Sequence, residues 1–330
     1  MTARGKVVVL GANGFLGSSV TRRLVEAGRD VRAMIRPGRA LNPNIRGLEL
    51  EVVFGDALDK ESLVRAMRGC DSAFHCVVDP RAWIHDTSSL FRTNVDGLRN
   101  SMDAALEVGV TRFVFTSSVC TIGLNANGVA SEADTFNWAD RATDYVRARV
   151  QAEDLFMDYC RDRGLPGVAC NVAMTWGAGD AQPTAHGRLL RNVVLKWRPA
   201  YWQTNLSMVG IVDAADAMIL AGERGRVGER YIVANRLMSF REVFDLGASY
   251  AGKRGPWLYV PMPVMHVVCF FARRLAYWAG RETVVTRDSL RLSRIMQDYD
   301  NAKARKELGW QPRPMEESIR EAVAWFRKHP

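Results

Sequence analysis

The 330-residue chain is poor in lysine and has no run of like charges. It contains 7 lysines against 38 arginines, and these cations are interspersed with acidic residues along the sequence. The net charge of +9 is therefore spread out, whereas a nucleic-acid-binding protein gathers its cations into a patch or stripe. We do not expect nucleic acid among the partners of this protein.

Cysteine is also scarce, and its spacing does not suit a metal site. The six cysteines form no CxxC pair and no zinc-ligand pattern, so no metal is expected. No signal peptide precedes the apolar run that begins at residue 6. We expect a cytoplasmic protein whose cysteines are reduced and mostly buried, namely Cys70, Cys76, Cys120, Cys160, Cys170 and Cys269.

No uninterrupted apolar run has the length of a membrane-spanning helix. The most apolar stretch, "PWLYVPMPVMHVVCFFA" at 256–272, contains three prolines and a histidine, and two arginines follow it. We predict that it forms a cap or an interface segment. The alternative is a peripheral membrane contact through 256–275. The sequence leaves open whether the protein is a monomer or a homodimer.

The first half of the chain alternates short apolar runs with amphipathic helical patterns. This alternation predicts an α/β fold with a doubly wound parallel sheet of the Rossmann type. Strands are expected at 6–12, 30–36, 48–56, 72–78, 112–118 and 167–174. Helices are expected between them at 19–29, 59–70, 88–109 and 144–164.

The pattern loosens after about residue 175, where tryptophan, proline and glycine become frequent. We expect residues 1–175 to form a dinucleotide-binding domain and residues 176–330 to form a smaller substrate-binding lobe. This lobe should lie over the carboxyl ends of the strands and be interleaved with the sheet rather than independent of it. It should contain a strand at 228–235 and helices at 239–252 and 315–329.

The stretch "GANGFLG" places Gly11, Gly14 and Gly17 where the first strand becomes the first helix. The chain must turn tightly there, approach a pyrophosphate closely and pack a helix against the sheet, and glycine permits all three. The spacing differs from the common dinucleotide fingerprint, since two residues separate each pair of glycines. We predict a dinucleotide site at this turn.

Two residues at later strand ends bear on the choice of dinucleotide. An acidic residue after the second strand would select NAD, but the sequence there is "MIRPGR". Arg36 is a candidate partner for a 2′-phosphate, so NADP is favoured, with NAD as the alternative. Asp56, after the third strand, either caps a turn or binds the adenine amino group.

A second group of residues suits proton transfer. The fifth strand ends in "FTSSVCTIG", so Ser118 lies where parallel sheets place their ligands. Tyr145 and Arg149 are four residues apart on one helical face. A nearby cation favours the phenolate, so we expect Arg149 to lower the pKa of Tyr145.

The chain resembles the extended short-chain dehydrogenases/reductases, also called the NAD-dependent epimerase/dehydratase family. Its closest likenesses are to the dihydroflavonol-reductase-like and hopanoid-associated sugar epimerase branch. Besides the glycine turn and the "YVRARVQAE" helix, the resemblance rests on "GDALD", "AFHCVV", "RTNVDGLRN", "FVFTSSVCTIG", "MVGIVDAADAM", "GERYIVAN" and "NAKARKELGWQPRP".

The resemblance implies roles for particular residues. Ser118 matches the catalytic serine, Tyr145 the general acid/base, and Arg149 the family's lysine. Asn94 would brace the helix beside the active site. Val172 stands where many members carry proline. The resemblance also implies that the cofactor is contacted by Gly11, Asn13, Gly14, Phe15, Leu16, Gly17, Arg36, Asp56, Ala57, Val77, Asn94, Tyr145 and Arg149.

Arginine in place of lysine keeps the positive charge but cannot relay a proton, because a guanidinium is essentially never deprotonated. We expect an active NAD(P)-dependent oxidoreductase that acts on a bulky apolar small molecule such as a steroid or terpenoid. A sugar or nucleotide-sugar epimerase is one alternative, and a catalytically impaired cofactor-sensing protein is another. Dehydration is disfavoured, because "SSVCT" has no acidic pair beside the serine.

Overall fold

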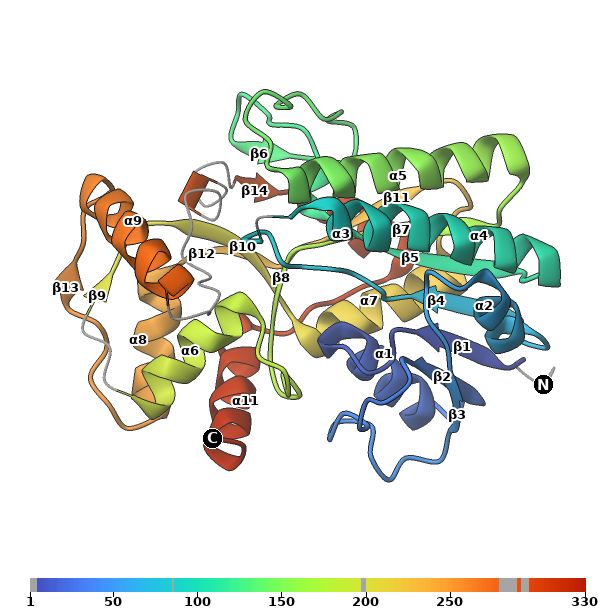
Figure 1. The fold of residues 1–330 in the computed structure, drawn as a ribbon, viewed down its shortest axis with the longest axis horizontal. Helices are drawn as coiled ribbons and strands as arrows, with labels where there is room; N and C mark the ends of the chain where they lie inside the picture. The colour runs from blue at the N-terminus through green and yellow to red at the C-terminus, as the bar shows by residue number, and fades with distance from the viewer. Residues whose placement is uncertain (1–4, 85, 197–199, 279–289, 292–296) are drawn as a thin grey trace.

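The computed structural model of the protein describes residues 5–84, 86–196, 200–278, 290–291 and 297–330. Its largest sheet has seven strands in the order β11–β7–β5–β4–β1–β2–β3, and every neighbouring pair is parallel (Figure 1). The chain starts at an inner strand and builds outward in both directions, so the predicted doubly wound sheet is confirmed. The strands are β1 (Val7–Leu10), β2 (Val31–Ile35), β3 (Glu51–Phe54), β4 (Ser72–His75), β5 (Arg112–Ser118), β7 (Gly167–Val172) and β11 (Arg230–Val233).

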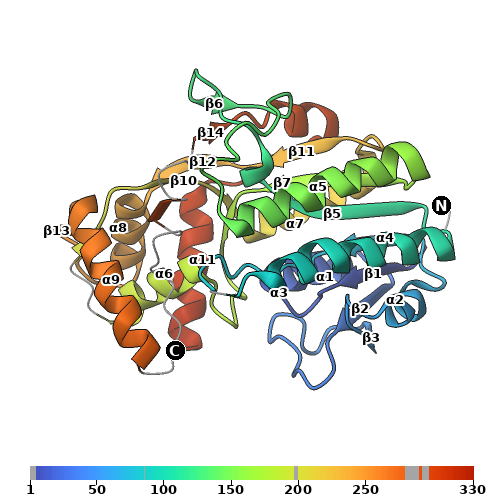
Figure 2. The same cartoon turned by 45° about the horizontal axis from the view of Figure 1, so that its top comes forward.

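Helices cover both faces of this sheet (Figure 2). On one face, α1 (Phe15–Glu26) packs against α7 (Ile211–Arg224). On the other face lie α2 (Lys60–Met67), α4 (Gly97–Val108) and α5 (Asp144–Arg163). The strands between them are apolar on both sides because both sides are covered.

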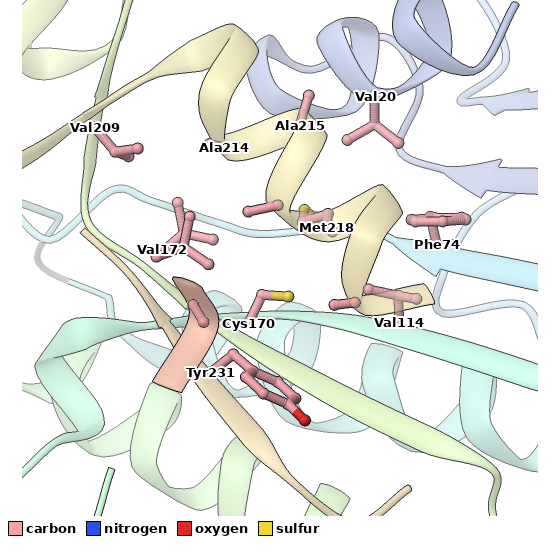
Figure 3. Close-up of a cluster of buried hydrophobic side chains, with 14 of the residues drawn as sticks. Val20, Phe74, Val114, Cys170, Val172, Val209, Ala214, Ala215, Met218 and Tyr231 are labelled. Atoms are coloured by element: carbon pink, nitrogen blue, oxygen red, sulfur yellow. The ribbon is translucent and has the colours of Figure 1, made fainter. Parts of the chain in front are cut away.

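The core on the α1–α7 face fixes the first helix against the sheet. Figure 3 shows Val20 of α1 and Met218 of α7 among Phe74, Val114 and Cys170 of the strands. Each of these side chains is at most 3% exposed. Since α1 begins at the glycine turn, this packing also fixes the turn relative to the strand ends.

The helix expected over 88–109 is continuous but contains a wide turn. It begins with α3 (Ser88–Phe91), widens into a π-helical turn over Arg92–Asp96, and continues as α4. A π-helical turn inserts an extra residue and changes which side chains face the core. Asn94 lies in this turn and is buried.

The second lobe is built on a three-stranded sheet. Its strands are β8 (Met174–Trp176), β10 (Asn205–Gly210) and β12 (Arg236–Ser239), in the order β12–β10–β8. The lobe also contains α6 (Ala185–Leu195), α8 (Phe240–Tyr250), α9 (Met262–Trp278) and α11 (Met315–Lys328), with the short paired strands β9 (Ala200–Tyr201) and β13 (Leu258–Tyr259). Two further short strands, β6 (Val129–Ala130) and β14 (Asp298–Tyr299), pair with each other.

The strand expected over 167–174 is divided between the two sheets. Val172 pairs with Ser118 of β5, whereas Met174 pairs with Met208 of β10. Ala173 lies at the branch, and its amide still donates to the Val233 carbonyl. The chain therefore leaves the large sheet directly beside the end of β5.

The chain returns to the large sheet after residue 175. Both α7 and β11 come from the later part of the sequence, and β11 completes the edge of the sheet beside β7. None of the six cysteines, all of which lie in the described ranges, forms a disulfide, and four of them are buried. None of the helices in the described ranges is both long and apolar enough to cross a bilayer.

Candidate active site

The glycine turn leaves no room for side chains. Gly11 has a φ of +78°, in the left-handed region, and a Cβ there would lie 3.0 Å from the backbone carbonyl of Cys76. A Cβ on Gly17 would lie 2.2 Å from the Gly11 carbonyl oxygen. Glycine is therefore required at both positions, and the turn lies close against the end of β4.

The first turn of α1 is open to an anion. Gly14 precedes the helix without a side-chain cap, and the first turn contains no acidic residue. The backbone N–H groups there have no intrahelical acceptors, and the helix dipole adds partial positive charge. This arrangement fits the pyrophosphate of a dinucleotide.

The side chains of the turn are used mainly to hold it in place. Asn13 donates from Nδ2 to the Ala40 carbonyl at 2.8 Å, and its Oδ1 accepts from the Asn42 amide at 2.6 Å. Leu16 packs against the core of the α1–α7 face. Phe15 lies at a small gap beside Trp176 of the second lobe. Contact of these three residues with a cofactor stays a prediction.

Arg36 is exposed immediately after β2, the strand next to β1. Within the described part of the chain it forms no hydrogen bond and no ion pair, so no acidic neighbour holds its guanidinium. An exposed cation one strand away from the glycine turn is compatible with a 2′-phosphate.

The remaining predicted cofactor residues lie at the ends of β3 and β4. Asp56 caps a turn, since its Oδ1 accepts from the Leu58 amide at 2.9 Å. Ala57 is 4% exposed and packs under Gly97 of α4. The Val77 amide nitrogen lies 3.1 Å from where a Cβ of Gly11 would be. The turn-capping role of Asp56 is observed, and its contact with adenine stays a prediction.

Ser118 and Tyr145 meet at the carboxyl edge of the large sheet. Ser118 ends β5, and its Oγ accepts from the Cys120 amide at 3.3 Å. Tyr145 is in the first turn of α5, a helix that Thr143 caps by accepting from the Val146 amide at 3.5 Å. Both side chains are partly buried.

Burial raises the pKa of Tyr145 to about 12, and the nearby Cys120 and Asp79 act in the same direction. Arg149 and a hydrogen bond with the Ser118 side chain lower the pKa, but they do not outweigh burial. The expectation that the cation makes Tyr145 acidic is therefore right in direction and wrong in net result. A phenol of this kind is held neutral near pH 7.

Arg149 is 1% exposed and points inward from α5. Its Nη2 donates to the Thr116 carbonyl of β5, and its guanidinium lies 5.5 Å from the centre of the Phe115 ring. Nε and Nη1 are buried and have no hydrogen-bond partner among the described residues. Two unpaired N–H groups of a buried cation fit the ribose hydroxyls of a dinucleotide, because such donors are costly to leave unsatisfied.

Glu153 is the residue of this site that sequence reasoning missed. It lies one further turn along α5 and is 3% exposed. Its Oε2 accepts from the Ser117 hydroxyl, from Thr121 Oγ1 at 2.9 Å and from Asn171 Nδ2 at 2.6 Å. Its Oε1 lies 2.8 Å from Nη1 of Arg230 on β11. Glu153 thus joins the ends of β5, β7 and β11 beneath Ser118, and the continued four-residue spacing after Tyr145 and Arg149 was its sequence signal.

Asn94 fixes the segment that follows β4. Its Oδ1 accepts from the Asp79 amide at 2.9 Å, and its Nδ2 donates to the Asp79 carbonyl at 3.2 Å. The Asp79 carboxylate in turn holds Arg81, at 2.6 Å from Oδ2 to Nη2. Asn94 therefore fixes the backbone at Asp79, and its role in bracing the helix beside the active site stays a prediction.

The arrangement as a whole fits a dinucleotide at three points. The glycine turn accepts close approach of phosphate, α1 presents its amino terminus, and Arg149 has two unpaired donors. Ser118 and Tyr145 lie at the same edge of the sheet as the first two, one strand beyond β4. Such a site can bind a nucleotide and exchange a proton with a substrate oxygen.

Comparison with known proteins assigns the chain to a family of nucleotide-dependent enzymes. The sequence profile of the NAD dependent epimerase/dehydratase family matches residues 7–234, which include the glycine turn, Ser118, Tyr145 and β11. Sterol demethylase protein B of Methylococcus capsulatus is 29% identical over 324 residues, covering 97% of this chain and 98% of that protein. A Synechocystis sp. protein with the provisional name dihydroflavonol 4-reductase is 28% identical over 326 residues, covering 97% and 94%.

A solved structure is similar over nearly the whole chain. The crystal structure of gox2253 matches with a TM-score of 0.85 and 34% sequence identity, covering 98% of both chains. The likeness includes the second lobe as well as the large sheet, since so little of either chain is left out.

Proposed function

This chain belongs to the NAD dependent epimerase/dehydratase family and is an NAD(P)-dependent oxidoreductase of the extended short-chain type. On that premise we propose that it reduces or oxidises a carbonyl or hydroxyl group of a bulky apolar molecule, such as a steroid or terpenoid. The observation that carries the proposal is the meeting of Ser118, Tyr145 and Arg149 at the edge of the sheet that holds the glycine turn.

A nicotinamide dinucleotide held by the glycine turn and Arg149 would supply or accept the hydride. The Tyr145 hydroxyl gives a proton to the substrate oxygen in reduction and takes it back in oxidation. The Ser118 hydroxyl donates a hydrogen bond to the same oxygen and orients it. Arg149 keeps a fixed positive charge beneath the phenol and offers Nε and Nη1 to ribose hydroxyls. The raised pKa keeps the Tyr145 phenol protonated near neutral pH, the form that can donate a proton to a substrate oxygen.

Support for an apolar substrate comes from a relative rather than from the aromatic residues of the second lobe. Sterol demethylase protein B is named for a sterol, and it matches this chain from end to end. Trp202 packs edge-on against Phe240 in the core of the lobe, and Phe270 and Phe271 are exposed on its outer surface. These aromatics are therefore not offered as walls of the substrate pocket.

Turnover with purified protein tests the proposal. NADPH oxidation is followed with a panel of keto-steroids, terpenoid ketones and apolar aldehydes, and Tyr145→Phe is expected to lower the rate by about 10²–10⁴. Tyr159→Phe is the matched control on the same helix, because the Tyr159 hydroxyl is bound to Asp103 at 3.0 Å, away from Ser118. Activity of Tyr145→Phe within tenfold of the parent contradicts the role of the tyrosine.

Two other outcomes identify the alternatives. A sugar nucleotide converted into its epimer with no net change in cofactor identifies an epimerase. Tight NADPH binding without turnover of any compound identifies a cofactor-sensing protein.

Cofactor choice is tested separately. Arg36 is expected to make NADPH bind at least several-fold more tightly than NADH, and Arg36→Asp should reverse this order. Fluorescence titration of both cofactors measures it, and equal affinities in the parent protein contradict the role of Arg36.

A further inference from the structure

Helix α9 carries its apolar side chains on the outside of the molecule. Met265 and Cys269 face the lobe and are 6% and 2% exposed. The opposite side of the helix is close to half exposed or more at each of six apolar positions, namely Val264, Val267, Val268, Phe270, Phe271 and Trp278. Positions 264, 267, 268 and 271 recur at helical spacing, so they form one continuous face.

The strand that precedes the helix extends this face. Trp257 is 67% exposed, and Leu258 and Tyr259 of β13 are each 46% exposed. Both views place β13 and α9 at the far end of the second lobe, away from the large sheet (Figures 1 and 2). We call residues 257–259 together with the outward positions of α9 the outer face. It does not overlap the candidate active site, which lies at the edge of the large sheet.

The stretch of sequence that forms the outer face contains basic residues but no acidic ones. Residues 246–281 contain no aspartate or glutamate, although the rest of the chain mixes both signs. Arg254 and Arg274 are exposed at either end of this stretch. The same stretch contains the cations Lys253, Arg254, Arg273, Arg274 and Arg281.

We propose that the outer face is a docking surface for an anionic lipid bilayer. An apolar helical face with tryptophan, tyrosine and arginine at its margins is suited to lie in the plane of the headgroups. The cations attract an anionic leaflet, and the stretch 246–281 itself contributes no acid to oppose them. α9 has 17 residues and is therefore about 25 Å long, enough for several side chains to enter the interface together.

Charge argues against a second copy of the chain as the occupant. A two-fold dimer through this face would bring the same cations opposite each other, with no acid in the stretch to pair with them. A bilayer containing anionic lipid supplies both the apolar depth and the negative charge.

Vesicle flotation with the full chain tests the proposal. The protein should bind phosphatidylcholine vesicles containing about 30% phosphatidylglycerol and bind pure phosphatidylcholine vesicles at least tenfold more weakly. Phe270→Ser/Phe271→Ser should weaken binding to the anionic vesicles at least tenfold. Phe54→Ser is the matched control. Phe54 is 61% exposed on β3 of the large sheet, so this substitution should leave vesicle binding unchanged.

The charge contribution has its own pair of variants. Arg254→Gln/Arg274→Gln should weaken binding about tenfold or more, whereas Arg65→Gln/Arg99→Gln on α2 and α4 should leave it unchanged. If the serine pair fails to fold, Val267→Ser/Val268→Ser gives the same readout. Equal binding by the parent and the outer-face variants overturns the proposal. So does a dimer in solution that is abolished by the serine pair, because a second copy would then cover the face.

Discussion

Helices α5 and α9 both depart from the usual pattern of an amphipathic helix, and they do so in opposite ways. α5 buries two charged side chains among its apolar ones, Arg149 and Glu153, at 1% and 3% exposure. α9 points valine, phenylalanine and tryptophan outward, with Phe271 at 58% and Trp278 at 82%. One helix buries charges that are normally solvated, and the other exposes apolar side chains that are normally buried.

The two helices differ in where the groups that pair with these unusual side chains lie. The inward polar groups of α5 are met by Ser117, Thr121, Asn171 and Arg230 from elements already inside the fold. Two guanidinium nitrogens of Arg149, Nε and Nη1, stay unpaired among the described residues. The outward apolar groups of α9 have few neighbours within the described part of the molecule. Buried charges in α5 therefore indicate pairing groups inside the protein, and exposed apolar side chains on α9 indicate a binding partner outside it.

The largest effect on stability is expected from removing Glu153, which pairs with groups inside the protein. Glu153→Ala should lower the free energy of unfolding by about 3–5 kcal/mol, because it leaves Arg230 without its carboxylate partner and the buried Ser117 hydroxyl without its acceptor. Urea denaturation measures the loss. Asp158→Asn on the same helix is the control, since its 2.7 Å pair with Arg161 is exposed and should contribute at most about 1 kcal/mol. Equal losses of unfolding free energy in the two variants would mean that the buried contacts of Glu153 contribute no more to stability than an exposed ion pair.

The burial of Tyr145 should appear in the pH dependence. Its pKa is raised from 10 to about 12 in the folded protein, so the neutral phenol is the favoured form. The stability this provides is complete below pH 10 and is lost as the pH rises through 12. For activity, reduction should not decline through Tyr145 between pH 7 and 9. Oxidation needs the phenolate and should rise about tenfold per pH unit over the same range. A reduction rate that falls with an apparent pKa below 8 contradicts this assignment.

The unpaired donors of Arg149 give the next test. Arg149→Met should weaken NADPH binding and lower kcat/KM about tenfold, because the ribose loses a charged donor and the phenol loses a cation that lowers its pKa. Arg149→Lys should keep most of both quantities. A parent protein that is inert towards every carbonyl compound, yet becomes active as Arg149→Lys, would show instead that arginine disables the site.

The smallest effect is expected on the outward face of α9. Phe271→Gln should change the free energy of unfolding by less than about 0.5 kcal/mol, because the side chain is already more than half in solvent. Phe156→Ala, at 0% exposure on α5, should cost about 3–5 kcal/mol. Chemical denaturation of both variants measures the contrast. A large loss for Phe271→Gln would mean that the outward face is held by contacts within the chain.

The local parts of the site could be predicted from the sequence. Gly11 and Gly17 are six positions apart, and the constraints on them arise within that turn and the adjoining strand. Tyr145 and Arg149 share a helical face because of their spacing alone. The order of strands and helices up to Val172 followed from periodicity. After it, two consecutive short strands join different sheets, and α6, β10 and α7 were not predicted.

The remaining features depend on contacts between distant segments. Glu153 is held by residues at 117, 171 and 230, and no short motif links these positions. The pKa of Tyr145 depends on how deeply the fold buries it, which the four-residue spacing does not determine. Periodicity indicates that α9 has an apolar face, but it does not tell whether that face points inward or outward.

The position of β11 has a consequence for how the protein is made. The large sheet lacks its last strand, and one face lacks α7, until residue 233 has been synthesised. At about 5–20 residues per second, a ribosome takes about 3–12 s to pass from residue 175 to that point. During this interval β7 is an unpaired edge, and the apolar surface that α7 will cover is open to water. Exposed strand edges and apolar surface favour aggregation, and residues 1–175 alone do not contain the complete sheet.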